Sequence, residues 1–139
     1  LVIAFLDASA LIYLVDGEVP WAQATQVTLQ QLAAQAPDLA LAVSRLSLLK
    51  CRVAPLRRSD QASLDRFEAL FAQPDLLVVE LSASVVEQAT QLRANHGLCT
   101  PDALQAACCL QLEPDAVMIT GDTSFQRVQA LQVSLIACS

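Results

Sequence analysis

The sequence predicts an α/β fold in which a parallel sheet of about five short strands carries helices on both faces. Short apolar runs alternate along the chain with longer segments whose apolar residues recur at helical spacing. The runs contain few polar residues, which is typical of strands that are covered on both sides of a parallel sheet. The 139 residues show no internal repeat and no linker, so we expect one domain, 1–139.

The N-terminal half shows two strand signals, each followed by a helix signal. Residues 1–6 form an unbroken apolar run, which predicts a buried strand, and a helix is expected directly after it. Pro20 favours the first turn of a second helix, and Pro37 ends that helix. Residues 39–43 predict the second strand, and Ser44 is a favoured N-cap for a third helix.

The following segments continue this alternation. Pro55 is expected to end or kink the third helix, and Asp60 to cap a fourth helix that stops at Pro74. A fifth helix is expected from Ser82 or Ser84. The remaining expected elements are a third strand at 76–79, a sixth helix with Thr100 as its cap, a fourth strand at 116–120, a helical turn at 124–128 and a last strand at 133–136.

The composition argues against several classes of protein. Although 55% of the residues are hydrophobic, no apolar run approaches the roughly 18 residues that a membrane-spanning helix requires. The first residues lack the basic segment of a signal peptide, and Asp7 interrupts their apolar run, so we expect no leader. The net charge of −6 does not favour general binding to nucleic acid.

The five cysteines are odd in number, contain no CxxC pair and mostly fall in apolar segments. This pattern predicts reduced, buried thiols in a cytoplasmic protein rather than disulfides. Their spacing does not match that of a zinc site, and His96 is the only histidine. The cysteines are Cys51, Cys99, Cys108, Cys109 and Cys138.

Three aspartates occupy positions that suggest a common site. Asp7 follows the first predicted strand, Asp122 follows the fourth, and Asp102 lies in the first turn of a helix. Because parallel strands end at one edge of the sheet, we expect these carboxylates to converge there. Two unit charges about 4 Å apart repel by about 4 kcal/mol at an effective dielectric constant near 20. The usual solution is a hard cation, Mg²⁺ or Mn²⁺, although any single one of these aspartates is better explained as a helix cap than as a metal ligand.

Four segments, taken together and in order, resemble a known family. They are 6–14 (LDASALIYL), 44–57 (SRLSLLKCRVAPLR), 100–107 (TPDALQAA) and 119–125 (ITGDTSF). They resemble the motifs of PIN-domain nucleases, particularly the VapC-type toxins of bacterial toxin–antitoxin pairs, and they span nearly the whole chain. The resemblance implies a single PIN-like domain, 1–139, with Mg²⁺- or Mn²⁺-dependent endoribonuclease activity.

The same resemblance implies roles for individual residues. Asp7, Asp102 and Asp122 would be the catalytic acids that bind the metal ion, which positions water for in-line attack on an RNA phosphodiester. Ser9 and Thr120 would be supporting hydroxyls that orient the carboxylates. The resemblance also implies a homodimer and a VapB-type antitoxin that covers the active site.

Lys50 is the one serious departure, since the family resemblance places a glutamate at this position. Lys50 lies four residues after Leu46 and three before Val53, so we expect it on the inward-facing stripe of its helix. Near Asp7 and Asp102 its ammonium group would partly replace the metal ion and weaken the affinity for divalent ions. We therefore expect an impaired ribonuclease.

The alternative for Lys50 is that its long side chain turns to solvent and joins a basic cluster. Five of the eight basic residues fall between positions 45 and 58. The cluster is explained either as a solvated helix face or as a stripe that contacts phosphates. Glu80, after the third strand, is a candidate substitute acid.

Two other functions remain open. One is a catalytically inactive PIN-like protein that binds RNA or an antitoxin. The other is a phosphoacceptor domain, which would also place an aspartate after the first strand. That domain would require a second acid beside Asp7, which Leu6 and Ser9 do not supply, and the chain has only three glycines and no phosphate-binding loop.

Overall fold

The computed structural model describes residues 1–137 and contains one five-stranded parallel sheet. The strand order is β3-β2-β1-β4-β5, which places β1 at the centre, between β2 and β4. The predicted α/β fold is therefore confirmed. The strands are β1 (Ile3–Leu6), β2 (Ala40–Ser44), β3 (Leu77–Val79), β4 (Ala116–Thr120) and β5 (Val133–Leu135).

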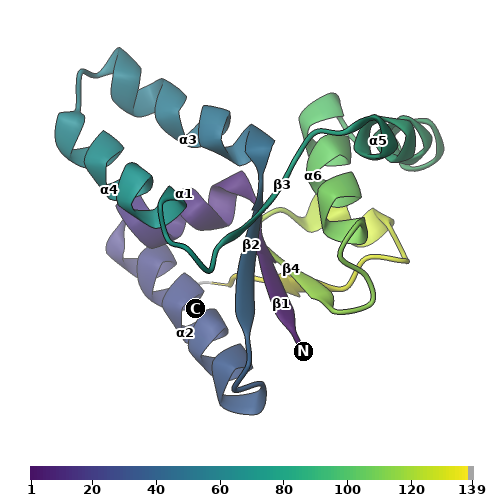
Figure 1. Ribbon diagram of the computed structural model, residues 1–139, viewed down its shortest axis with the longest axis horizontal. Coiled ribbons are helices and arrows are strands. Elements are labelled where there is room, and N and C mark those ends of the chain that lie inside the picture. The colour runs from purple at the N-terminus through teal and green to yellow at the C-terminus, as the bar shows by residue number, and fades with distance from the viewer. Residues whose placement is uncertain (138–139) are drawn as a thin grey trace.

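Helices cover both faces of the sheet, with α1–α4 on one side and α5 and α6 on the other (Figure 1). Within residues 1–137, no helix is both long and apolar enough to cross a membrane. The helices are α1 (Ala8–Asp16), α2 (Val19–Gln35), α3 (Arg45–Arg57), α4 (Gln61–Phe71), α5 (Ala83–His96), α6 (Thr100–Leu110) and the 3-10 helix η1 (Thr123–Arg127).

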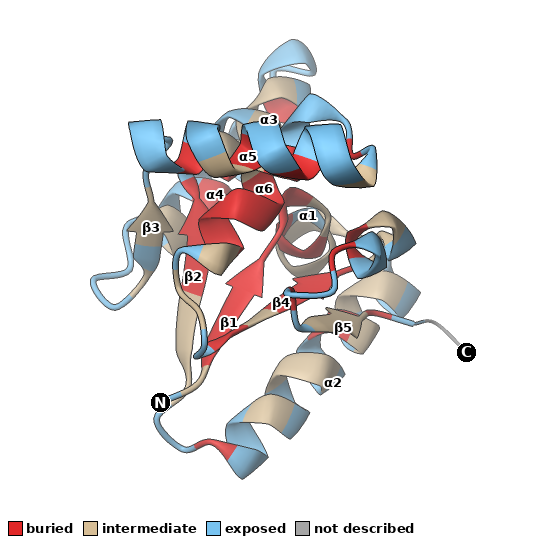
Figure 2. Cartoon of the chain, turned by 90° about the vertical axis from the view of Figure 1, so that its right-hand side faces the viewer, coloured by how far each residue is buried: buried red, intermediate tan, exposed pale blue. Residues whose placement is uncertain are grey.

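The apolar run of β1 is explained by two separate cores, one on each face of the sheet. Ile3 and Phe5 belong to the core beneath α5 and α6, and Ala4 and Leu6 belong to the core beneath α1–α4. Side chains of a strand alternate between faces, so a strand buried on both sides needs apolar residues at every position. Figure 2 shows this burial along β1.

Most predicted helix starts are confirmed, but that of α6 is wrong by one residue. The backbone of Cys99, not that of Thr100, has the extended conformation of an N-cap, and its carbonyl oxygen accepts the amide of Ala103. Pro101 fits the second position as well as the first, because amides of the first turn lack an intrahelical acceptor. The confirmed N-caps are Ser44, Asp60 and Ser82.

The inward-facing stripe predicted for α3 is also wrong. Leu49 and Leu56 are 60% and 61% exposed, and Leu46 and Val53 lie beside them on the same outer face. Apolar residues occur all round this helix, so their spacing did not identify the buried side. The residues that α3 buries are mostly small: Ser47, Leu48, Cys51 and Pro55, the last lying within the helix.

Three of the described cysteines, Cys51, Cys108 and Cys109, are free and buried, as the sequence predicted. Burial raises the pKa of the Cys51 and Cys109 thiols to about 12 and that of Cys108 to about 11. All three are free and buried, and thiols of this kind are unreactive at neutral pH. Cys99 is exposed, which corrects the prediction for that residue, and Cys138 lies outside the described residues.

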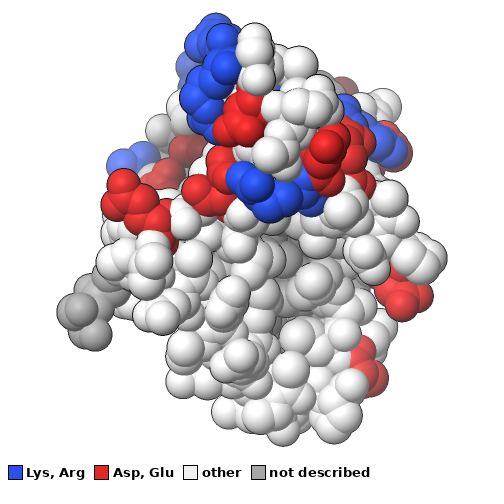
Figure 3. All heavy atoms as spheres, turned by 90° about the vertical axis from the view of Figure 1, so that its left-hand side faces the viewer, with Lys and Arg blue, Asp and Glu red and all other residues white. Residues whose placement is uncertain are grey.

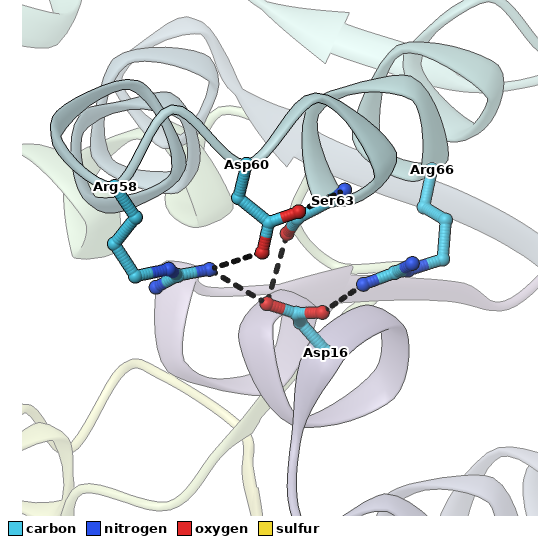
Figure 4. Close-up of polar contacts among 5 residues, drawn as sticks. All are labelled: Asp16, Arg58, Asp60, Ser63 and Arg66. Carbon is cyan, nitrogen blue, oxygen red and sulfur yellow. Dashed lines mark hydrogen bonds and ion pairs between the residues drawn. The ribbon is translucent and has the colours of Figure 1, made fainter.

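Asp16, the last residue of α1, ties that helix to the turn between α3 and α4 (Figure 4). Its carboxylate accepts hydrogen bonds from Arg66, from Ser63 Oγ (2.9 Å) and from Arg58 Nη2 (3.4 Å), which also contacts Asp60 (3.1 Å). Burial raises the pKa of Asp16, but these hydrogen bonds and positive charges outweigh burial and hold the pKa below its ordinary value.

We expect Asp16→Asn to reduce the free energy of unfolding by about 1 kcal/mol at pH 7, because a networked ion pair is lost. Since the folded state lowers the pKa of Asp16, this stabilisation exists above the unfolded-state pKa and disappears as the pH falls through the folded-state pKa. Urea unfolding at pH 7 and at decreasing acidic pH measures it, with the exposed Asp75→Asn as control. A loss of unfolding free energy in Asp16→Asn that does not change with pH would contradict the assignment of this stabilisation to the Asp16 carboxylate.

Candidate functional site

Asp7 lies at the carboxyl end of β1 and is also the N-cap of α1. Its side chain is buried, and the residue is only 5% exposed. Carboxylate oxygen Oδ1 accepts hydrogen bonds from Ser9 Oγ (2.7 Å) and from the backbone amide of Ala10 (2.9 Å), and Oδ2 accepts one from Thr120 Oγ1 (2.5 Å). The sequence offered two explanations of Asp7, as a helix cap and as a member of a functional site. They are compatible, because Oδ1 caps α1 while Oδ2 faces β4.

Burial raises the pKa of the Asp7 carboxyl group. The hydrogen bonds from Thr120, Ala10 and Ser9 oppose this effect, as does the positive charge of Lys50, but the net shift is upward. Burial disfavours the ionised form, and the hydrogen-bond donors and the ammonium group favour it. Asp7 is thus a buried carboxyl group held by three hydrogen bonds, and the positive charge of Lys50 partly offsets the effect of burial on its pKa.

The turn after β4 brings Asp122 to the same edge of the sheet as Asp7. The amide of Asp122 donates to Thr120 Oγ1 (3.0 Å), and the amide of Gly121 donates to Ser9 Oγ (3.4 Å). Ser9 and Thr120 therefore each connect Asp7 to this turn. A side chain at Gly121 would place its Cβ 3.0 Å from the ring of Tyr13, so glycine permits the close packing of α1 on the turn.

Asp102 and Asp122 occupy the remaining acidic positions that the sequence suggested. Asp122 caps η1, its Oδ1 accepting the amide of Ser124 (2.8 Å). Asp102 lies in the first turn of α6 and is half-buried. Lys50 lies in the second turn of α3, is half-buried, and forms no ion pair within 4.0 Å with any of the described residues. Asp7 and Asp122 thus follow adjacent strands at one edge of the sheet, but the predicted group of three carboxylates that could hold a metal ion is not found among residues 1–137.

The residues present do not fit a tightly held divalent ion. Among residues 1–137, no group of three or more His, Cys, Asp and Glu side chains is arranged to hold a metal ion. Asp7 already accepts three hydrogen bonds, which leaves about one of its four acceptor positions free. The positive charge of Lys50, which lowers the pKa of Asp7, also disfavours a further cation beside this carboxylate.

The basic cluster at positions 45–58 is largely paired with acids. Arg45 Nε contacts Glu80 Oε1 at 2.9 Å, and Arg52 Nε contacts Glu68 Oε1 at 2.7 Å. Figure 3 shows basic and acidic side chains interleaved on one part of the surface. The cluster is therefore better explained as a solvated face than as a phosphate-binding stripe, and Glu80 pairs with Arg45 rather than serving the Asp7 site.

One polar cluster was not singled out in the sequence. Ser44, Ser47 and Gln105 are 0%, 0% and 1% exposed and hydrogen-bond to one another between α3 and α6. The available signal was a glutamine among the otherwise apolar residues 103–110 of α6. Its partners could not be read from spacing, because they lie about sixty positions away in the chain.

The sequence model of the PIN domain matches residues 4–131. None of the curated proteins compared with the chain matches it. Among solved structures, the chain is similar to VapBC2 from Rickettsia felis bound to a DNA fragment from its promoter, with a TM-score of 0.75 and 16% sequence identity. That similarity covers 96% of this chain and 98% of the other.

Two further structures have the same fold. VapBC-1 from nontypeable Haemophilus influenzae has a TM-score of 0.72 and 19% identity, over 96% of this chain and 97% of that one. VapC20 from Mycobacterium tuberculosis, a toxin that cleaves the sarcin-ricin loop, has a TM-score of 0.66 and 19% identity. That similarity covers 88% of this chain and 92% of VapC20. At these identities the similarity shows the fold alone.

Replacing the buried charge of Asp7 is expected to stabilise the protein. Asp7→Asn keeps an acceptor for Ser9 and Ala10, and its amide can donate to Thr120 Oγ1 in place of the bond that Oδ2 accepts; it removes the cost of burying an ionised carboxylate, so the melting temperature in EDTA should rise by about 3 °C. The gain should grow as the pH rises through the folded-state pKa, because a raised carboxyl pKa makes the ionised native state less stable.

Asp7→Ala is the matched control, since it also removes the cap and should lower stability by about 1 kcal/mol. Differential scanning calorimetry at several pH values measures both variants. A melting temperature for Asp7→Asn below that of the unaltered protein would show that burial of this charge is not a destabilising feature.

Proposed function

Because this chain belongs to the PIN-domain family, we propose that it is a VapC-like endoribonuclease that depends on Mg²⁺ or Mn²⁺ and is impaired by Lys50. The observation that carries this proposal is the buried Asp7 carboxylate, which Ser9 and Thr120 orient and on which the Lys50 charge acts. Asp102 and Asp122 are the other acids of the proposed catalytic and metal-binding set. The RNA-cleaving activity of the structurally similar VapC20 supports RNA as the substrate class.

A bound Mg²⁺ or Mn²⁺ would supply an activated water and a clamp on the phosphodiester. The contribution of the chain itself is orientation and charge. Ser9 and Thr120 fix the plane of the Asp7 carboxylate, and Thr120 also holds the amide of Asp122. Lys50 neutralises part of this negative charge, which lowers the affinity for a divalent ion. The proposed impairment follows from this positive charge and from the small number of free acceptor positions on Asp7.

A second candidate function is a PIN-like protein that no longer cleaves RNA but binds it or an antitoxin. This candidate is favoured by the absence, within residues 1–137, of a three-ligand group for a metal ion. The two candidates differ in whether the unaltered chain cleaves RNA at all and in whether an acid at position 50 increases cleavage, because both keep the same fold and the same Asp7 environment.

We expect Lys50→Glu to increase RNA cleavage in Mn²⁺ by about 100-fold, the size of effect typical of an electrostatic group in an active site. Cleavage of a labelled RNA, followed by gel electrophoresis, measures the change. Lys50→Gln is the matched control, because it removes the charge without adding a metal ligand, and it should recover only a small part of the gain.

Adding Asp7→Ala to Lys50→Glu should abolish the recovered activity. No cleavage by Lys50→Glu would favour the non-cleaving candidate. Cleavage by the unaltered chain that survives Asp7→Ala would exclude Asp7 as a catalytic residue.

We also propose a VapB-type antitoxin as partner, assembly as a homodimer, and a cytoplasmic location. The similar structures include VapBC complexes and a toxin–antitoxin complex from Klebsiella pneumoniae, which supports the antitoxin. The buried free thiols support a reducing compartment. The support for a homodimer is the apolar outer stripe of α3, which consists of Leu46, Leu49, Val53 and Leu56 and adjoins the exposed Leu81.

We expect Leu49→Glu/Leu56→Glu to convert the dimer into a monomer, because two charges would then face each other across a symmetric apolar contact. Light scattering coupled to size-exclusion chromatography measures the mass. Val27→Glu, on the exposed surface of α2, is the control and should leave the mass unchanged. A dimer that survives both α3 substitutions would place the interface elsewhere.

A further inference from the structure

We propose that Arg93 and Arg127 form a binding site for the phosphate backbone of single-stranded RNA. Both side chains reach the loop between α5 and α6, and they come from different elements. Arg93 Nη1, in the last turn of α5, donates to the carbonyl oxygen of Leu98 (2.9 Å). Arg127 Nη1, at the end of η1, donates to the carbonyl oxygen of Gly97 (3.4 Å). Because these carbonyls belong to consecutive residues, the two guanidinium groups are held at the same short stretch of backbone.

Neither guanidinium group is neutralised by an acid. Within residues 1–137, neither arginine forms an ion pair within 4.0 Å, whereas Arg45 and Arg52 each pair with a glutamate. A carbonyl oxygen carries no net charge, and a guanidinium group has five N–H donors, so each arginine keeps its charge and most of its donors for an anion. Both residues are exposed, and the fork of a guanidinium group matches the oxygens of a phosphate.

The two arginines adjoin elements that carry proposed catalytic acids. The loop enters α6, whose first turn contains Asp102, and η1 has Asp122 as its N-cap and Arg127 as its last residue. Five residues of a 3-10 helix span about 10 Å, which corresponds to about three phosphates along a nucleic-acid strand. An RNA strand that passes Asp122 can therefore place a neighbouring phosphate at Arg127. Arg93 and Gly97 also line a groove between α5 and α6, so the loop is open to a ligand.

This inference rests on the proposed function only in taking RNA as the ligand. The net charge of −6 gives no general attraction for RNA, so binding requires a local cationic site. The cluster at positions 45–58 is largely paired with acids, and Arg93 and Arg127 are not. Contacts with phosphates position a strand without reading its bases, so the two arginines would orient RNA and not select its sequence.

We expect Arg93→Gln/Arg127→Gln to weaken the binding of a fluorescein-labelled single-stranded RNA of about 12 nucleotides by about tenfold in about 0.1 M salt. Fluorescence anisotropy in EDTA measures binding without cleavage. Each phosphate contact with a single strand contributes about 0.7 to the slope of log affinity against log salt concentration, so the magnitude of that slope should fall by about 1.4. Arg93→Lys/Arg127→Lys keeps both charges and should retain the slope.

Arg45→Gln/Arg52→Gln is the matched control, because it removes the same number of positive charges from arginines that pair with acids. The slope of this control should equal that of the unaltered chain. A merely structural role of Arg93 and Arg127 would lower the melting temperature of their glutamine variant and leave the slope unchanged. If that double variant does not fold, the two single variants replace it, each with an expected fall of about 0.7.

The proposal is overturned by an unchanged slope in the glutamine variant, by an equal fall in the control, or by a failure of the unaltered chain to bind the RNA. Unchanged RNA binding together with weaker binding of poly-glutamate would assign the two arginines to an acidic protein partner instead. All of these measurements are made without a metal ion. A failure of Lys50→Glu to cleave RNA would therefore overturn the proposed function and not this site.

Discussion

The arrangement of the site depends on the hydrogen bond from Thr120 Oγ1 to Asp7 Oδ2, which joins the ends of the adjacent strands β1 and β4. The parallel pairing of β1 and β4 brings the ends of both strands to one edge of the sheet. The hydroxyl then stabilises a carboxylate that burial disfavours, and it also accepts the amide of Asp122. One short polar contact thus fixes two acids on two elements that are more than a hundred residues apart in the chain.

Lys50 changes the electrostatic balance of this edge. A buried carboxylate requires donors or a cation, and here Ser9, Ala10 and Thr120 supply the donors while the lysine supplies a charge. A divalent ion would have to compete with that charge and would find most acceptor positions of Asp7 already used. The Asp7 carboxylate is therefore held by hydrogen-bond donors from α1 and β4 and by one positive charge from α3.

The sequence was sufficient to predict the sheet, because each central strand has apolar residues on both faces and the helix starts carry capping side chains such as Ser44 and Asp60. It was also sufficient to place Asp7 and Asp122 at one edge. It was insufficient for α3, whose apolar residues surround the helix, so that the exposed Leu49 was assigned to the core. Contacts across α3 and α6, such as those of Gln105, depend on tertiary packing and leave no periodic signal.

Helix α1 shows how the site is coupled to the rest of the molecule. Its N-terminal carboxylate, Asp7, is favoured by the helix dipole, whereas Asp16 at the opposite end is disfavoured. The C-terminal charge is retained because Arg58 and Arg66 bind it, and these residues belong to the segment that follows α3. The segment from the end of α3 to α4 is therefore joined to α1 through Asp16, and the start of α3 is joined to α6 through Gln105. Both contacts are polar and directional, so each adds a geometric constraint to the apolar packing of these helices.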